Sequence, residues 1–249
     1  MEKKSKELLN NESELNKKDN EKDNENNSDD EENKSGSDIE IDINTYPLKI
    51  IMIGNTSVGK TSIVKRYLEN KFEFNSTDAT INALFNSKKI KVDPFTEAEL
   101  QIWVTAGQER YHSLTKSYLI NANGILIVFD LGDEKSFNDL DSWLEVIKDT
   151  IDENNIIQIL VGNKSDLSDI KITNEIASKY AKEHNMKYLS VSAKDGVNIE
   201  SLFDMIGNDC IKKIQEDEAE NDNARIYSDL NGQIGNNKKI GSQKTKQCC

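Results

Sequence analysis

Short apolar runs alternate with helical patterns through the middle of the chain. Four runs have the length and continuous hydrophobicity of buried parallel strands, at residues 48–53, 125–129, 156–161 and 188–191. Between and after them, apolar residues recur at helical spacing over 137–151, 176–181 and 199–214. Strands that alternate with helices predict an α/β fold with a mostly parallel sheet.

The first 45 residues have a different composition. They are rich in Asn, Lys, Glu, Asp and Ser, and such a segment buries too little apolar surface to offset the entropy lost on ordering. We therefore predict a disordered acidic N-terminal extension at 1–45. Because Ile39, Ile41 and Ile43 alternate with acids, a short edge strand is the alternative there.

Apolar residues thin out again from Glu216. This change predicts one domain at 46–215, followed by a flexible tail at 216–249. The central segment is long enough to build one hydrophobic core.

The net charge of −13 comes mostly from the N-terminal extension, which holds 15 acidic and 7 basic residues. An acidic surface repels phosphate backbones, so we expect no nucleic-acid partner. Three cysteines, two of them the last residues, form no disulfide framework and favour a reducing compartment. The longest apolar run, 125–129, is shorter than the roughly 18 residues of a membrane-spanning helix, and the charged N-terminus is unlike a secretory signal. These features indicate a cytoplasmic protein.

A phosphate-binding pattern, G-x-x-x-x-G-K-[ST], follows the first predicted strand directly. In such a loop the glycines let backbone N–H groups point inward around phosphates, and the next helix offers its positive N-terminus. Lys60 would neutralise the β- and γ-phosphates as a catalytic cation, and the Thr61 hydroxyl would ligate Mg²⁺. The predicted phosphate-binding residues are Gly54, Asn55, Thr56, Ser57, Val58, Gly59, Lys60, Thr61 and Ser62.

A second polar string, Asn163-Lys164-Ser165-Asp166, follows the predicted strand at 156–161. The Asp166 carboxylate can accept both the N1–H and the exocyclic amine of guanine, a donor pair that adenine lacks. Ser192-Ala193-Lys194 follows the next strand, where a backbone amide could meet the guanine carbonyl oxygen. Together with the phosphate loop, the two strings predict a guanine-nucleotide site that includes Asn163, Lys164, Asp166, Ser192, Ala193 and Lys194.

Between these strings lies Trp103-Val104-Thr105-Ala106-Gly107-Gln108-Glu109-Arg110. With the phosphate loop, the guanine strings, Ser136-Phe137 and the terminal Cys-Cys, it resembles the Rab branch of the Ras-superfamily small GTPases. The resemblance implies the P-loop GTPase fold, a doubly wound, mostly parallel six-stranded sheet with helices on both faces. It also implies a GTP/GDP-dependent switch in vesicle-mediated and intracellular protein transport.

The resemblance implies roles for individual residues. Gly107 would give its backbone N–H to the γ-phosphate, and Gln108 would orient the attacking water. Thr80 matches the switch threonine that closes onto Mg²⁺, and Phe72 is a candidate for the aromatic that packs on the purine. The effector-binding aromatic triad of Rab proteins matches Phe85, Trp103 and Tyr118.

The main departure from the family is Val104, because the family has aspartate directly after the tryptophan. Valine cannot hold Mg²⁺ through water or link it to the second switch, so we expect permissive Mg²⁺ dependence, faster nucleotide exchange and impaired hydrolysis. Asn82 and Leu84 stand where Rab proteins usually have glycine and aspartate. The alternative to a working GTPase is a pseudo-GTPase scaffold that binds nucleotide but hardly hydrolyses it. An ATP-using kinase is a weaker third possibility, since Asp166 favours guanine.

The chain ends in Cys248 and Cys249, which the resemblance identifies as geranylgeranylation sites. Four lysines just upstream would favour an anionic leaflet. We therefore expect a lipid-anchored protein on the cytosolic face of an endomembrane or the plasma membrane. Its partners would be effector, exchange-factor, activating and prenyl-chaperone proteins.

Overall fold

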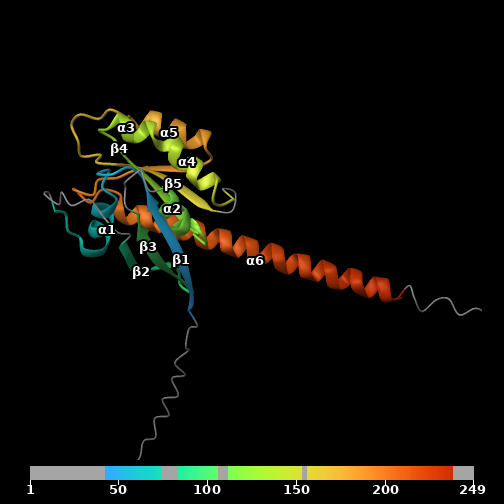
Figure 1. Cartoon of the computed structure of the whole chain (residues 1–249). Coiled ribbons are helices and arrows are strands. Elements are labelled where there is room, and N and C mark those ends of the chain that lie inside the picture. Colours follow the sequence, from blue (N-terminus) through green and yellow to red (C-terminus); the bar gives the residue numbers. More distant parts are fainter. Residues whose placement is uncertain (1–42, 74–83, 106–111, 153–155, 238–249) are drawn as a thin grey trace, which may run out of the picture. The chain divides into compact units, whose positions relative to one another are not determined.

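A computed structural model describes residues 43–73, 84–105, 112–152 and 156–237, with the backbone alone described for 112–115 and 223–237. Figure 1 shows the elements, which in chain order are β1 (Asn44–Ile53), α1 (Lys60–Glu69), β2 (Leu84–Asp93), β3 (Thr96–Val104), α2 (His112–Leu119), β4 (Gly124–Asp130), α3 (Glu134–Asn138), α4 (Leu140–Lys148), β5 (Ile157–Asn163), α5 (Asn174–Glu183), β6 (Lys187–Ser190) and α6 (Ile199–Asn237). Of the isoleucines in the alternative edge strand, Ile43 precedes β1, and the other two lie outside the described residues.

The six strands form one sheet in the order β2-β3-β1-β4-β5-β6. Strand β2 runs antiparallel to β3, and every other neighbouring pair is parallel. The predicted doubly wound, mostly parallel six-stranded sheet is therefore confirmed. Because the order reverses at β1, the carboxyl ends of β1, β4 and β5 meet at one edge, where α/β proteins bind their ligands.

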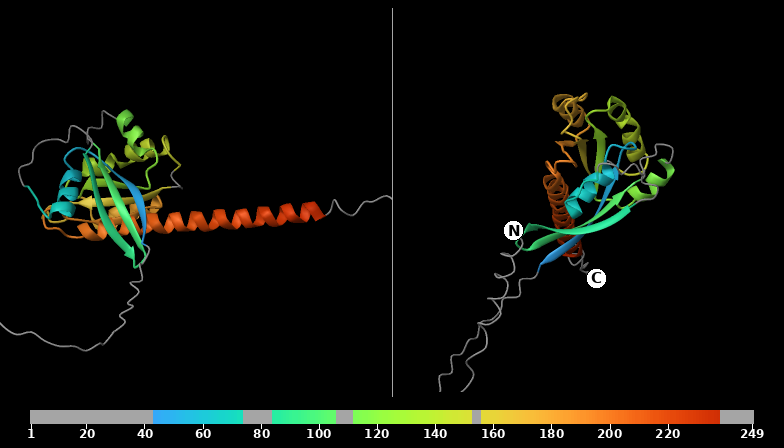
Figure 2. Two further views of the ribbon diagram at one scale, coloured as in Figure 1. Left: turned by 90° about the horizontal axis from the view of Figure 1, so that it is seen from below. Right: turned by 90° about the vertical axis from the view of Figure 1, so that its left-hand side faces the viewer.

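Two hydrophobic cores cover the two faces of this sheet. Alternate residues of β1 divide between them, since Ile50 and Met52 join one core while Ile51 and Ile53 join the other. Helices α1 and α6 close the first core, and α4 and α5 close the second (Figure 2). Burial on both faces explains why β1, β4 and β5 are largely apolar, whereas β6, which was also predicted to be buried, is only partly buried at the edge of the sheet.

The β2–β3 hairpin was not among the four strands that the apolar runs predict. Every second residue of β3 is buried and the residues between them are half-exposed, so the strand carries a period of two instead of a continuous run. Strand β2 lies at the edge of the sheet and exposes six of its ten residues.

Two helical predictions differ from the structure in detail. The pattern at 137–151 is divided at Asp139 into α3 and α4. Helix α6 continues to Asn237, whereas a flexible tail was predicted from Glu216. Because the packed turns up to Ile214 supply the helix nucleus, the polar residues that follow add hydrogen bonds without the cost of nucleation. Within the part of the chain that the structure describes, no helix combines the length and apolar composition needed to cross a bilayer.

Candidate functional site

The phosphate-binding loop joins β1 to α1 and depends on two glycines. Gly54 has a φ of 135° and Gly59 a φ of 96°. A Cβ on Gly54 would lie 2.0 Å from the carbonyl oxygen of Val128, and a Cβ on Gly59 would lie 2.3 Å from Nδ2 of Asn163. Both positions therefore exclude larger residues for steric as well as conformational reasons.

Lys60, the first residue of α1, is only 6% exposed and turns back over this loop. Its Nζ donates hydrogen bonds of 2.7 Å to the Gly54 carbonyl and 2.8 Å to the Asn55 carbonyl. The ammonium group thus lies at the mouth of the loop, where it can balance the charge of a polyphosphate.

Asn163 connects the phosphate loop to the two guanine strings. It is 1% exposed at the end of β5, and its Nδ2 donates a 2.8 Å hydrogen bond to the Val58 carbonyl. Its Oδ1 accepts a 3.2 Å hydrogen bond from the backbone N–H of Ala193. One buried amide therefore fixes three segments that are far apart in the sequence.

Asp166 lies beside the Ser192-Ala193-Lys194 string. Its carboxylate accepts a 2.7 Å hydrogen bond from Ser192 Oγ and lies 3.4 Å from the Lys194 ammonium. Burial favours the neutral acid, but the hydrogen bonds from Ser192, from its own backbone N–H and from Lys194 outweigh it and hold the pKa of Asp166 below its ordinary value. The group is therefore an anionic acceptor at neutral pH, which recognition of the guanine N–H donors requires.

Lys164 adopts a left-handed backbone conformation, with a φ of 66°. Its ammonium forms a 2.6 Å ion pair with Asp130 at the end of β4. The other carboxylate oxygen of Asp130 accepts a 2.9 Å hydrogen bond from the Gly132 N–H. Asp130 thus holds the Lys164 side chain across the edge of the sheet, a role that the sequence analysis did not assign.

Arg66 on α1 was also missed by the sequence analysis. Its Nε donates a 2.8 Å hydrogen bond to the Ala193 carbonyl, its Nη2 donates to the Lys194 carbonyl, and its Nη1 donates to the Asn70 carbonyl. The guanidinium therefore ties the helix behind the phosphate loop to the string that would read the base. A single arginine in an amphipathic helix carries no sequence signal for this contact.

Val104 is completely buried at the end of β3 and belongs to the same core as Leu100 and Ile102. It lines a cavity of about 140 Å³ whose walls also include Thr61 and Leu84. The following Thr105 hydroxyl donates to the Met52 carbonyl at 3.0 Å. Mg²⁺ prefers hard oxygen donors, and Thr61 carries a hydroxyl that would suit it, whereas the side chain at position 104 is hydrocarbon alone.

The three aromatic residues of the expected effector surface lie together. Phe85 and Trp103 have ring centroids 4.9 Å apart, and Trp103 and Tyr118 are 5.8 Å apart. Phe85 is 51% exposed, so this cluster reaches the surface. Phe72, the expected purine-packing residue, is half-buried and packs against the α1–α6 core.

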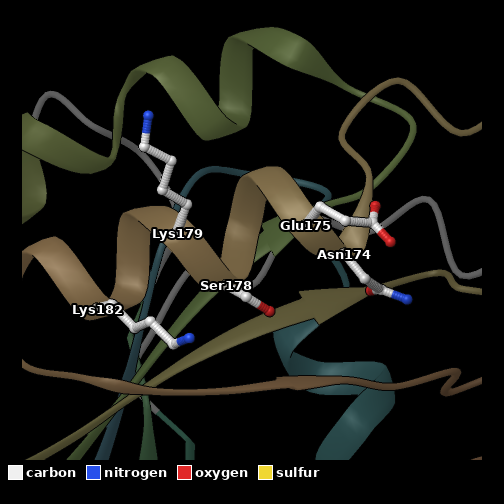
Figure 3. A pocket seen from close by; sticks show the side chains of 5 residues that line it. All are labelled: Asn174, Glu175, Ser178, Lys179 and Lys182. Carbon is white, nitrogen blue, oxygen red and sulfur yellow. The ribbon is translucent and has the colours of Figure 1, made fainter.

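Several predicted residues lie outside the described ranges: Thr80, Gly107, Gln108, Cys248 and Cys249. A hollow of about 400 Å³ lies along α5, where Figure 3 shows the side chains of Asn174, Glu175, Ser178, Lys179 and Lys182. None of the predicted site residues lines it. Within the described residues, no group of three or more His, Cys, Asp and Glu side chains is arranged to hold a metal ion.

Comparison with known proteins identifies the family. Residues 49–212 match the Ras family. Human Ras-related protein Rab-39A is 36% identical over 177 residues, which are 70% of this chain and 82% of that protein. Ras-related protein Rab-11B of Dictyostelium discoideum is 38% identical over 164 residues, 66% of this chain and 73% of that protein. Ras-related protein rab-11.1 of Caenorhabditis elegans is 32% identical over 210 residues, which are 82% of this chain and 95% of that protein.

The phosphate loop, the Asn163 bridge and the anionic Asp166 are thus found in a chain whose relatives are Ras-related Rab proteins. The chain belongs to the Ras family and is a Rab-like small GTPase, a GTP-binding switch.

Proposed function

We propose that the chain hydrolyses GTP to GDP and phosphate and acts as a switch in vesicle-mediated and intracellular protein transport. The observation that carries this proposal is the Asn163 bridge, which joins the phosphate loop to the string that would read guanine. Because the two subsites share one buried amide, base recognition and phosphate binding occur on one rigid surface.

The roles proposed for the phosphate loop and Asp166 follow from the described site, and those for Gly107 and Gln108 follow from the family resemblance. Backbone N–H groups of residues 54–61 and the Lys60 ammonium bind the β- and γ-phosphates, and Asp166 selects guanine. Gln108 orients the attacking water in line with the leaving GDP, and Gly107 donates its N–H to the γ-phosphate. Water adds to the γ-phosphorus as its bond to the bridging oxygen breaks, so GDP and inorganic phosphate form.

Thr61 and Thr80 are the residues that would hold Mg²⁺ together with the nucleotide phosphates. The ion would neutralise charge on the phosphate oxygens. Val104 supplies no carboxylate to orient a metal-bound water, so we infer weaker Mg²⁺ dependence and faster nucleotide exchange than an aspartate there would give.

A second candidate function is a pseudo-GTPase scaffold that binds guanine nucleotide but hardly hydrolyses it. Complete burial of Val104 beside Thr61 favours it, because the metal-linked coupling between the switches is missing from this position. The two candidates share the nucleotide site and differ only in turnover.

The nucleotide content of the purified protein tests both candidates. We expect bound GDP or GTP, competition by GTP but not by ATP, and phosphate release in a single-turnover assay with an activating protein. Bound nucleotide without phosphate release would support the scaffold. A protein that takes up neither GDP nor GTP at any Mg²⁺ concentration would contradict both.

We further propose geranylgeranylation of Cys248 and Cys249 and attachment to the cytosolic face of an endomembrane or the plasma membrane. Two lipid chains give stable attachment, whereas one is marginal. The exposed Phe85 in its cluster with Trp103 and Tyr118 is the proposed effector contact. Intact-mass spectrometry after expression with a prenyltransferase would detect the two additions, and their absence would contradict the anchor.

A further inference from the structure

Asn55 occupies the first variable position of the phosphate loop, but its side chain forms its contacts with the opposite core. The residue is 8% exposed. Its Nδ2 donates a 2.7 Å hydrogen bond to Oδ2 of Asp139, and its Oδ1 accepts a 2.9 Å hydrogen bond from the indole Nε1 of Trp143. The loop is thus attached through this side chain to the junction of α3 and α4.

The chemistry of the two partners fixes the orientation of the amide. An indole nitrogen only donates and an ionised carboxylate only accepts, so the Asn55 oxygen must face Trp143 and its nitrogen must face Asp139. Trp143 is 1% exposed and is anchored in the second core. Asp139 is the last residue before α4 and is therefore fixed by the helix that it precedes.

The same residue also contacts Lys60 through its backbone. The Asn55 carbonyl accepts a 2.8 Å hydrogen bond from Lys60 Nζ. A rotation of the residue-55 backbone would move this carbonyl and, with it, the lysine that faces the phosphates. The side-chain network therefore limits the positions that the loop and its lysine can adopt.

We propose that Asn55, Asp139 and Trp143 form a positioning network that preorganises the phosphate loop and sets the rate of nucleotide release. The inference rests on the proposed nucleotide binding. Preorganisation lowers the ordering cost of binding, so its loss shortens the residence time of the nucleotide.

An exchange of the two side chains tests the network. Asn55→Asp places two carboxylates in contact and removes the hydrogen bond between these two side chains. Because a buried polar group is then left unpaired, we expect GDP dissociation to accelerate about tenfold. Asp139→Asn alone removes the charged acceptor and should accelerate release by a smaller factor. The double variant Asn55→Asp with Asp139→Asn restores a carboxylate–amide pair in the reverse order, and release should return to within about threefold of the unaltered protein.

Asp149→Asn, directly after α4, removes a charge only from an exposed ion pair with Lys116; it is the matched control and should not change release. The chain has two tryptophans, so the indole ¹⁵N–¹H resonance of Trp143 can be assigned by comparison with Trp103→Phe. We expect that resonance to shift in Asn55→Asp and to return in the double variant, which a general loss of stability would not produce.

Unchanged release in Asn55→Asp, or no recovery in the double variant, would overturn the network while leaving the proposed function intact. If the unaltered protein itself retains no labelled GDP, the proposed function fails instead. If Asn55→Asp does not fold, Asp139→Asn carries the test, through its release rate and the Trp143 resonance.

Discussion

The guanidinium of Arg66 is bonded to the carbonyl of Ala193, which lies 127 positions later in the sequence. The bond joins α1 to the loop after β6, so the helix that begins at the phosphate loop also supports the string that is proposed to read the base. Rigidity of the base subsite therefore depends on a side chain that need not touch the nucleotide.

Replacement of Arg66 by alanine should accelerate GDP dissociation about tenfold. The reason is the loss of charged hydrogen bonds to the Ala193 and Lys194 carbonyls, which contribute roughly 1.5–3 kcal/mol when a charged group is involved. Release of a fluorescent GDP analogue in a stopped-flow instrument measures the effect. Arg66→Lys keeps the charge but cannot occupy both carbonyls through a planar fork, so it should recover only part of the loss. An alanine variant with the original rate would show that the loop holds its shape without Arg66.

Replacement of Val104 by aspartate, the residue expected from the family, should increase the Mg²⁺ dependence of nucleotide affinity at least about tenfold. The new carboxylate would lie beside Thr61, where it can orient a metal-bound water. Titration of nucleotide affinity with and without a chelator measures the change. Val104→Asn, of similar size but without charge, is the control and should give a smaller effect. If Val104→Asp binds nucleotide as the unaltered protein does, valine at this position is not the cause of any weakness in metal handling.

Replacement of Tyr67 by phenylalanine should leave stability unchanged or raise it by about 1 kcal/mol. Tyr67 is 2% exposed and stacks on Phe203 at 3.9 Å between centroids, but its buried hydroxyl has no hydrogen-bond partner among the described residues. Tyr180→Phe is the matched control, because the Tyr180 hydroxyl donates a 2.7 Å hydrogen bond to Asp141. Urea denaturation should therefore show a loss of stability for Tyr180→Phe but not for Tyr67→Phe. A clear loss of stability in Tyr67→Phe would mean that the hydroxyl has a favourable contact.

The buried hydroxyl of Tyr67 should also make the folded protein less stable in alkaline solution. Burial, with a further contribution from the charges of Glu200 and Asp204, raises the pKa of Tyr67 far above its ordinary value of 10.0. The unfolded chain therefore loses this proton near pH 10, while the folded chain retains it, and the free energy of unfolding decreases as pH rises through that range. Urea midpoints at pH 8 and pH 10.5 measure the decrease, which should be smaller in Tyr67→Phe. An identical decrease in both proteins would assign it to other groups.

The phosphate loop and the guanine strings stand out in the sequence because each is a contiguous segment whose residue types indicate a particular chemistry. Arg66, Asp130 and Asn163 show the limit of this approach. The sequence predicted Asn163 as a site residue, but its bonds to Val58 and Ala193 depend on how distant segments meet, and no local pattern encodes them.

The strands and helices also differ in how readily the sequence predicts them. The strands buried on both faces appeared as continuous apolar runs, whereas β3 carries its signal in the alternation of Thr96, Ala98, Leu100, Ile102 and Val104, all of which are buried. That signal was available in the sequence, and a search for period-two segments would have found it. The continuation of α6 beyond Ile214 could not be read from its polar residues, because its stability comes from the packed turns that precede it.

The length of α6 has a consequence for heating. A helix of 39 residues spans about 58 Å, yet side chains from Gln215 to Asp222 are exposed and add nothing to either core. The first turns will melt only when the whole domain unfolds, while the outer turns follow an ordinary helix–coil equilibrium. Circular dichroism at 222 nm should therefore decline gradually before the cooperative transition, and ligands that protect the domain should leave that early slope untouched.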